Sequence, residues 1–235
     1  MLRTEATTPP GAAVLEVSLF GPGCGEAIAV HLGEGRWMLV DSCLDEEGSP
    51  AALGYLEAIG VAPEQVVLVV ATHWHDDHIA GLAETVQRCA DAEFVYSGAL
   101  RSEEFFALVG ALSERSQISR SGVTEFAAVV ETLDERGGEP PRMAVEGRRL
   151  WTAGDGTMPA FVDALSPSDT SMLLSQRAIA ELLPSVNTHK KAVAAPKPNH
   201  ASIVLWVGIG EERILLGADL EETANPGTGW TALLD

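Results

Sequence analysis

The sequence predicts an α/β protein, an α+β sandwich in which two sheets pack face to face and are covered by helices. Three observations indicate this fold. Short apolar segments come in groups separated by glycine turns, and segments with helical spacing lie between these groups. Hydrophobic residues make up 46% of the 235 residues, enough for one good core or two small ones. Residues 137–141 form only a weak boundary, so we expect one domain over residues 1–235.

In the first half of the chain, a group of strands is expected first, followed by helices with single strands between them. Three strands separated by glycines come first, and Ser49-Pro50 then suits the N-cap and first turn of a helix. The uninterrupted apolar run over residues 66–70 has the length of a buried strand. The strands of this half are expected over residues 14–20, 27–32, 36–41, 66–70 and 94–96. The helices are expected over residues 51–59, 80–90, 103–112 and 124–133.

The second half is expected to consist mostly of strands. A helix capped within Ser168-Asp169-Thr170 is expected to run to Leu183, because Pro184 cannot continue it. A hairpin is expected to turn at residues 208–211, where two glycines occur. The strands of this half are expected over residues 142–145, 149–151, 162–165, 203–207 and 213–216.

The most informative segment is Thr72 to His78, which reads Thr-His-Trp-His-Asp-Asp-His directly after the apolar run. It places three imidazoles, at His73, His75 and His78, and the carboxylate of Asp77 where a buried strand ends and a helix begins. Neutral imidazole nitrogen and carboxylate oxygen suit Zn²⁺ and similar divalent metals. Without a metal, burial would leave several of these groups unsatisfied, at about 1–3 kcal/mol each. A metal site is therefore predicted at the end of this strand.

Four segments together resemble the metallo-β-lactamase superfamily. They are the His-x-His-x-Asp-His motif, the glycine-rich residues 20–27, Asn199-His200-Ala201-Ser202 before an apolar run, and residues 214–219, which end in Asp219. Residues 20–27 are similar to the first hairpin of the competence-type branch, which is attached to DNA-uptake channel proteins. The resemblance implies the αββα metallo-β-lactamase fold, with two mixed sheets covered by helices.

The resemblance also implies a first metal position, held by His73, His75 and His200. His200 lies 19 residues before Asp219, about the separation that the superfamily uses for this pair. The frame around His200 differs from the usual Gly-His-Thr-x-Gly, and competence-type members often carry asparagine there. A polar loop residue is therefore the alternative role for His200. The expected metal is zinc (Zn²⁺), as one ion or two, with Mn²⁺ or Fe²⁺ as alternatives.

A second metal position is implied by Asp77, His78 and Asp219, with Asp219 bridging the two ions. Asp41 would lie beneath the histidine loop and fix the tautomer of an imidazole. Members of the competence-type branch usually carry a further His-His-Gly-Ser-like motif after the bridging aspartate, whereas no histidine follows His200 here. Either the C-terminal part of the domain is missing or the second position is incomplete, and we expect the former.

The expected function is that of a metal-dependent hydrolase. Metals in such sites lower the pKa of water towards about 7 and stabilise negative charge on oxygen. Asp77 would orient or deprotonate this water. A phosphodiester or another small anionic substrate is expected. An ester, thioester or lactone substrate is the alternative within enzymes, and a non-catalytic metal-binding interaction or sensor module is the alternative outside them. The sequence predicts no oligomeric state.

The net charge of the chain limits the classes of binding partner that are expected. A net charge of −19 repels nucleic-acid backbones and anionic lipid, so neither long nucleic acid nor a membrane is an expected partner. All three lysines, Lys190, Lys191 and Lys197, fall within eight positions before His200. We expect them to hold an anionic group of the substrate. An exposed, solvated loop is the alternative.

A cytoplasmic location is expected. No apolar run reaches the roughly 18 residues of a membrane span, and residues 1–13 lack the apolar segment of a signal peptide. The three cysteines are few and unevenly placed, which fits a reducing compartment. Cys24 and Cys43 are expected to be packed thiols, with metal ligation as the alternative. Trp74 is expected to pack against its neighbouring loop rather than to stack on a substrate.

Overall fold

Strand β4 (Val66–Ala71) lies in the middle of the first sheet and is buried on both faces, as its uninterrupted apolar sequence predicts. Successive side chains of a strand point to opposite faces. Val69 and Ala71 therefore join the apolar cluster beneath the helices, whereas Leu68 and Val70 join the cluster between the two sheets. The structure, a computed structural model, describes residues 8–21, 25–100, 122–137, 140–153, 158–182 and 198–234.

The first sheet has six strands in the order β1-β2-β3-β4-β5-β6. The pairs β1–β2 and β2–β3 are antiparallel, and the pairs from β3 to β6 are parallel. Besides β4, its strands are β1 (Glu16–Phe20), β2 (Ala27–His31), β3 (Trp37–Val40), β5 (Glu93–Ser97) and β6 (Arg142–Ala144).

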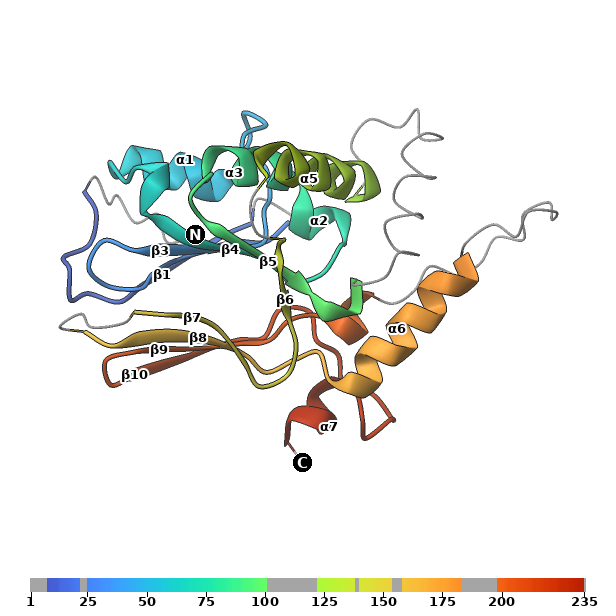
Figure 1. Cartoon of the computed structure of the whole chain (residues 1–235). Helices are drawn as coiled ribbons and strands as arrows, with labels where there is room; N and C mark the ends of the chain where they lie inside the picture. The colour runs from blue at the N-terminus through green and yellow to red at the C-terminus, as the bar shows by residue number, and fades with distance from the viewer. Residues whose placement is uncertain are drawn as a thin grey trace.

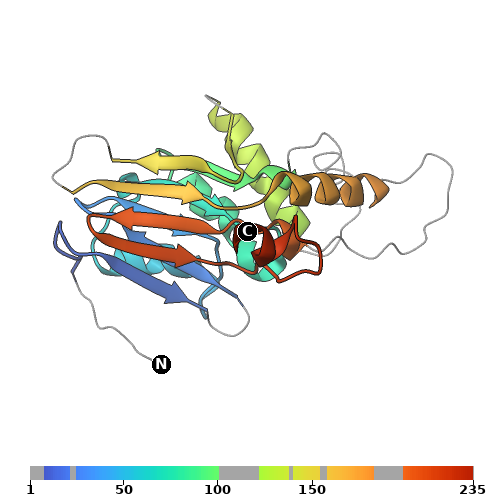
Figure 2. The same ribbon diagram turned by 90° about the horizontal axis from the view of Figure 1, so that it is seen from below.

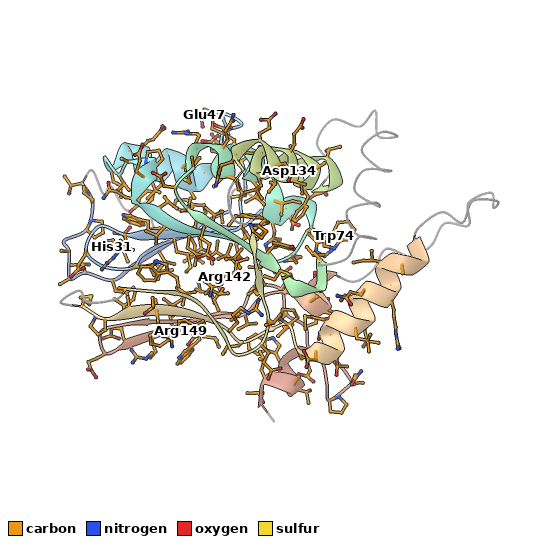
Figure 3. The ribbon with its side chains drawn as sticks, in the orientation of Figure 1. His31, Glu47, Trp74, Asp134, Arg142 and Arg149 are labelled. Carbon is orange, nitrogen blue, oxygen red and sulfur yellow. The ribbon has the colours of Figure 1, made fainter. Side chains whose placement is uncertain are left out.

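The second sheet has four antiparallel strands in the order β10-β9-β8-β7. They are β7 (Arg148–Thr152), β8 (Ala160–Ala164), β9 (Leu205–Ile209) and β10 (Glu212–Leu216). Figure 2, seen from below, shows the second sheet stacked over the first one. Arg142 joins the two sheets where β6 meets β7, because its guanidinium donates to the carbonyls of Leu150 at 2.8 Å and Arg149 at 3.0 Å (Figure 3).

The longer helices of the first half cover the outer face of the first sheet, and α6 extends from one end of the sandwich (Figure 1). Two packed sheets with helices outside the first are the metallo-β-lactamase-type architecture that the sequence predicted. Both sheets were expected to be mixed, but only the first one is, because every pair of the second sheet is antiparallel. Among the described helices, none is long and apolar enough to cross a membrane. The helices are α1 (Ala51–Ala58), α2 (Asp76–Ile79), α3 (Leu82–Arg88), α5 (Gly122–Arg136), α6 (Asp169–Leu182) and α7 (Gly229–Leu234), with short 3₁₀ turns η1 (Pro63–Gln65), η2 (Gly98–Leu100) and η3 (Pro198–Ala201).

Most predicted elements are confirmed, and three local predictions need comment. The cap expected at residues 168–170 is confirmed, and Ser168 provides it, because its Oγ accepts a hydrogen bond from the Ser171 N–H at 3.1 Å. The prediction that Ser49-Pro50 forms the N-cap and first turn of α1 was wrong. Pro50 itself occupies the N-cap, and no side chain caps this helix. The helix expected over residues 103–112 lies outside the described residues.

Candidate metal centre

The histidine loop begins where β4 ends, and the neighbouring strand β3 delivers Asp41 to the same edge. Parallel strands place their carboxyl ends side by side. The Asp41 N–H donates to the Val70 carbonyl at 2.8 Å, and the Thr72 N–H donates to Asp41 Oδ1 at 2.7 Å. Asp41 therefore bonds to the end of β4 at Val70 and to the first residue of the loop at Thr72, which gives the imidazoles a fixed base.

Asp41 orients two imidazoles at once. Its side chain is 2% exposed, and its Oδ2 lies 2.9 Å from His78 Nδ1 and 2.6 Å from the Thr72 hydroxyl. Since Thr72 donates its proton to Asp41, its oxygen accepts from His73 Nδ1 at 2.9 Å. Both Nδ1 atoms carry protons in this network, so Nε2 of His73 and Nε2 of His78 are left with free lone pairs, as metal ligands require.

These free nitrogens converge with His75 and Asp219. His73 Nε2 lies 3.1 Å from His75 Nδ1 and 4.0 Å from Asp219 Oδ2, and His78 Nε2 lies 3.5 Å from Asp219 Oδ1. The ligand atoms of His73, His75 and Asp219 all lie within 4.8 Å of one another. Asp219 follows β10 and comes from the other sheet, so the centre forms where the ends of the two sheets meet.

Burial and mutual repulsion keep His73 neutral. Burial, aided by the neighbouring His78 and His75, lowers the pKa of His73 to about 3. Burial also acts to lower the pKa of His78, but the hydrogen bond and charge of Asp41, together with Asp219 and Asp77, outweigh it and raise that pKa to about 9. A cation at this position would take the place of the His78 proton and receive the same carboxylate charges.

Comparison with known proteins identifies the family. The profile of the Metallo-beta-lactamase superfamily matches residues 25–233. The chain belongs to this superfamily. No curated protein gives a match.

Solved structures of metallo-β-lactamases are similar to the chain at low identity. The Cronobacter sakazakii (Enterobacter sakazakii) metallo-β-lactamase with the HARLDQ motif is 13% identical, with a TM-score of 0.47, over 94% of this chain and 66% of that one. A mutant of its motif is 15% identical, with a TM-score of 0.48, over 85% and 59%. MEM-A1, a subclass B3 metallo-β-lactamase from a soil metagenome library, is 15% identical, with a TM-score of 0.39, over 90% and 63%. The chain thus spans less than two thirds of the length of each of these proteins.

Two further residues that the superfamily resemblance implied as ligands, Asp77 and His200, lie outside the groups whose ligand atoms converge. Asp77 is half-buried on α2 beside His78, but it is in neither of the two groups whose ligand atoms converge. His200 is also in neither group. Its ring is 35% exposed, with Nε2 3.3 Å from Glu221 Oε2. Cys24 and the lysines Lys190, Lys191 and Lys197 lie outside the described residues.

Asn199, next to His200, has a side-chain oxygen without a hydrogen-bond partner among the described residues. Its Nδ2 donates to Glu221 Oε1 at 3.1 Å, while its Oδ1 is buried and has no hydrogen-bond partner among the described residues. An orphaned amide oxygen of this kind, together with three imidazoles and the Asp219 carboxylate, fits the donor set of a divalent metal. The residues present therefore suit the metal that the superfamily implies.

Two neighbouring side chains behave as ordinary packing groups. Cys43 is buried, and burial, with the charges of Glu26, Asp45 and Asp41, raises the pKa of its thiol to about 11. Trp74 packs against the apolar cluster beneath the helices, at the end of the molecule where α2 lies (Figure 3). Both placements agree with the packing roles expected for these residues.

Sequence reasoning missed Glu26. This half-buried carboxylate lies in the electrostatic neighbourhood of His78, Asp41, Asp219 and Asp77. It belongs to no ligand motif, and the only signal for it was its place after the glycine-rich turn of the first hairpin.

Proposed function

We propose that the chain is a metal-dependent hydrolase that uses activated water on a small anionic substrate, with a phosphodiester as the first choice. The observation that supports this most is the convergence of His73, His75, His78 and Asp219 over a buried aspartate at one sheet edge. Burial and the neighbouring imidazoles of His78 and His75 lower the pKa of His73, so its ring stays neutral and can offer a nitrogen lone pair to a cation.

The proposed ligands fall into two sets. His73, His75 and His200 are assigned to one ion, and His78, Asp77 and Asp219 to another, with Asp219 shared. Zn²⁺ is the expected metal, with Mn²⁺ or Fe²⁺ as alternatives. When bound, such metals activate water as a nucleophile and stabilise negative charge on oxygen.

The residues of the chain contribute orientation and proton transfer. Asp41 holds His78 directly and His73 through Thr72, so neither ring can rotate its free nitrogen away from the centre. Asp77 is half-buried at the start of α2 and is our candidate for orienting or deprotonating the attacking water. Asp219 faces both His73 and His78, which places a carboxylate between the two ligand sets.

The substrate class rests on two features. The first-hairpin resemblance to the competence-type branch favours phosphodiester bonds, and we propose that this branch is the chain's closest affiliation. The net charge of −19 disfavours long polyanions, so a small phosphodiester reconciles the two. Lys190, Lys191 and Lys197 remain our candidates for holding the anionic group.

The test is metal analysis combined with a substrate panel. We expect His75→Ala to lose bound metal and hydrolysis together, because His75 Nδ1 lies 3.1 Å from His73 Nε2 and belongs to the group that converges with Asp219. His31→Gln is the matched control. His31 lies at the other end of the sandwich from Trp74 and hydrogen-bonds Val14 and Gly35 there (Figure 3). The panel contains bis(p-nitrophenyl) phosphate, a lactone and a thioester.

The outcomes separate the alternatives. Turnover of the phosphodiester alone supports the proposal, and turnover of the lactone or thioester assigns the centre to acyl chemistry. Tight metal binding with no turnover indicates a binding module. Full activity in His75→Ala contradicts the metal-centre assignment. Metal content of His200→Ala, measured alongside, decides whether His200 is a ligand or a partner of Glu221 alone.

A further inference from the structure

Glu221 lies two residues after Asp219, on the loop that leaves β10, and both oxygens of its carboxylate contact the turn η3. Asn199 Nδ2 donates to Glu221 Oε1 at 3.1 Å, and His200 Nε2 lies 3.3 Å from Glu221 Oε2. Asp219, on the same loop, faces imidazoles of the histidine loop instead. Two carboxylates of one short segment therefore serve two different groups of nitrogen atoms.

The backbone of this loop is held on both sides of the Glu221 side chain. Leu220, which precedes it, is buried, and its N–H donates to the Gly217 carbonyl at 3.4 Å. The Glu221 carbonyl accepts from the Trp230 N–H of α7 at 3.2 Å. A Cβ atom on Gly229 would overlap this carbonyl oxygen, so the approach of α7 requires a glycine there. The Glu221 side chain therefore starts from a fixed point.

The turn η3 is attached to the histidine loop on its other side. The Ser202 N–H donates to the Asn199 carbonyl at 3.1 Å, and the Ile203 N–H donates to the Thr72 carbonyl at 3.1 Å. Thr72 begins the histidine loop. The turn that carries His200 is thus bonded to the histidine loop through backbone atoms and to the Asp219 loop through Glu221.

Glu221 determines which nitrogen of His200 keeps a lone pair. The hydrogen bond from Asn199 fixes one oxygen of the carboxylate, so the other stays beside the His200 ring. A lone pair on Nε2 would face this negative charge, so the proton is favoured on Nε2 and the lone pair on Nδ1. His73 and His78 have the opposite tautomer, in which Nδ1 carries the proton and Nε2 is free.

We propose that Glu221 is a positioning residue of the metal centre, which holds the His200 ring so that Nδ1 is the nitrogen available to a cation. The inference rests on the proposed assignment of His200 to the first ion. His200 belongs to neither of the two groups whose ligand atoms converge, so its approach to an ion depends on the residue that holds its ring. The pair of Glu221 and His200 is then the counterpart of Asp41 and His78, with the two ring nitrogens exchanged.

The first measurement determines the His200 tautomer in metal-free protein. Long-range proton–nitrogen NMR correlations distinguish the two tautomers of an imidazole, and a His200→Gln variant identifies the His200 signals. We expect the His200 proton mainly on Nε2 in the wild type and a mixture of both tautomers in Glu221→Gln, because an amide can present either a donor or an acceptor to the ring. Glu222→Gln is the matched control, since it removes the same charge from the next residue, whose side chain bonds the Thr231 hydroxyl. Circular dichroism checks that each variant folds.

The second measurement is the affinity for Zn²⁺, obtained by competition with a chromophoric chelator. We expect the Kd of the first Zn²⁺ to rise by about tenfold in Glu221→Gln and to stay unchanged in Glu222→Gln. Glu221→Asp keeps the charge but shortens the reach, so it should restore part of the affinity and part of the tautomer preference.

The outcomes separate this inference from the proposed function. A wild-type His200 with its proton on Nδ1, or a tautomer that is the same in Glu221→Gln, overturns the role of Glu221 and leaves the hydrolase proposal standing. A changed tautomer with unchanged Zn²⁺ affinity overturns its role in metal binding. If Glu221→Gln does not fold, the wild-type tautomer and the Glu221→Asp variant still decide. A wild type that binds no Zn²⁺ removes the metal centre itself, and this inference with it.

Discussion

Asp41 combines an unusual backbone conformation with a central chemical role. Its φ angle is 57°, in the left-handed region that is costly for most residues, and its carboxylate serves both Thr72 and His78. Asparagine and aspartate tolerate this region better than other non-glycine residues do. The chemistry of this position can therefore be changed while its backbone is kept.

We predict that Asp41→Asn folds but binds Zn²⁺ about 10–100-fold more weakly. Asp41 Oδ1 accepts from the Thr72 N–H, and Oδ2 accepts from the Thr72 hydroxyl and His78 Nδ1. In asparagine one of these oxygens becomes an NH2 donor, which must face either the Thr72 N–H or the donors of Thr72 and His78, so the network that fixes the two imidazoles is weakened. Competition with a chromophoric chelator measures the affinity, and thermal unfolding checks the fold. Unchanged affinity in Asp41→Asn would show that the Asp41–Thr72–His73 network does not orient the ligands.

The residues of the ligand loop were easier to recognise from the sequence than the residues that surround the loop in the folded chain. His73, His75, Asp77 and His78 fall within six consecutive positions, so the loop motif could be recognised without knowledge of the fold. The Glu26 N–H bonds the Asp77 carbonyl, and Asn199 Oδ1 is buried with no partner among the described residues. Neither feature leaves a pattern in the residue types. His200 shows the reverse case, because a ligand-type residue at a suitable spacing has its ring beside Glu221.

Among the elements, β9 shows why the position of the hairpin turn at Gly208 was predicted wrongly. Gly208 was expected in the hairpin turn, but it lies within the strand and pairs with Phe161 of β8. A Cβ at Gly208 would overlap the Phe161 ring, over which the guanidiniums of Arg149 and Arg213 lie at 4.3 Å and 5.3 Å from the centroid. The glycine makes room for an aromatic side chain on the outer face of the second sheet.

We predict that Gly208→Ala lowers the free energy of unfolding by about 1–3 kcal/mol, because the Phe161 ring must leave the two guanidiniums. Urea unfolding measures the change. The same substitution in a Phe161→Ala background should cost less, since the obstructing ring is gone. Equal costs in both backgrounds would show that the ring is not what the glycine accommodates.

The short helix α2 was also missed, for a different reason. Its four residues, Asp76–Ile79, are too few to show helical periodicity, and it forms because the loop is held on both sides. The Ser42 N–H donates to the His78 carbonyl at 2.7 Å, and the Asp77 carbonyl receives the Glu26 N–H. Tertiary contacts of this kind determine the conformation of the ligand loop, whereas local sequence determines the long helices and buried strands.

At the scale of the whole molecule, the excess of negative charge should affect stability. With 34 acidic and 15 basic residues, the folded chain repels itself, and the repulsion is greater when the chain is compact. We predict that the free energy of unfolding rises as NaCl increases from about 10 mM to about 500 mM, because salt shortens the range of the repulsion. Urea unfolding in the presence of a chelator measures this without interference from metals. A decrease with salt would show that the surface ion pairs outweigh the net charge.

The layered architecture was predictable because its cause is simple. Apolar runs with glycine turns form strands, and a strand that is buried on both faces needs helices or another sheet packed against each face. Which strands pair, and that β6 adjoins β7 through Arg142, depends on long-range contacts that no local pattern encodes.

The parallel register of β3 and β4 has a consequence for how such a protein can change. Asp41, Thr72 and the imidazoles depend on two neighbouring strand ends for their positions. Substitutions in the peripheral segments can therefore accumulate while Asp41, Thr72 and the imidazoles keep their relative positions.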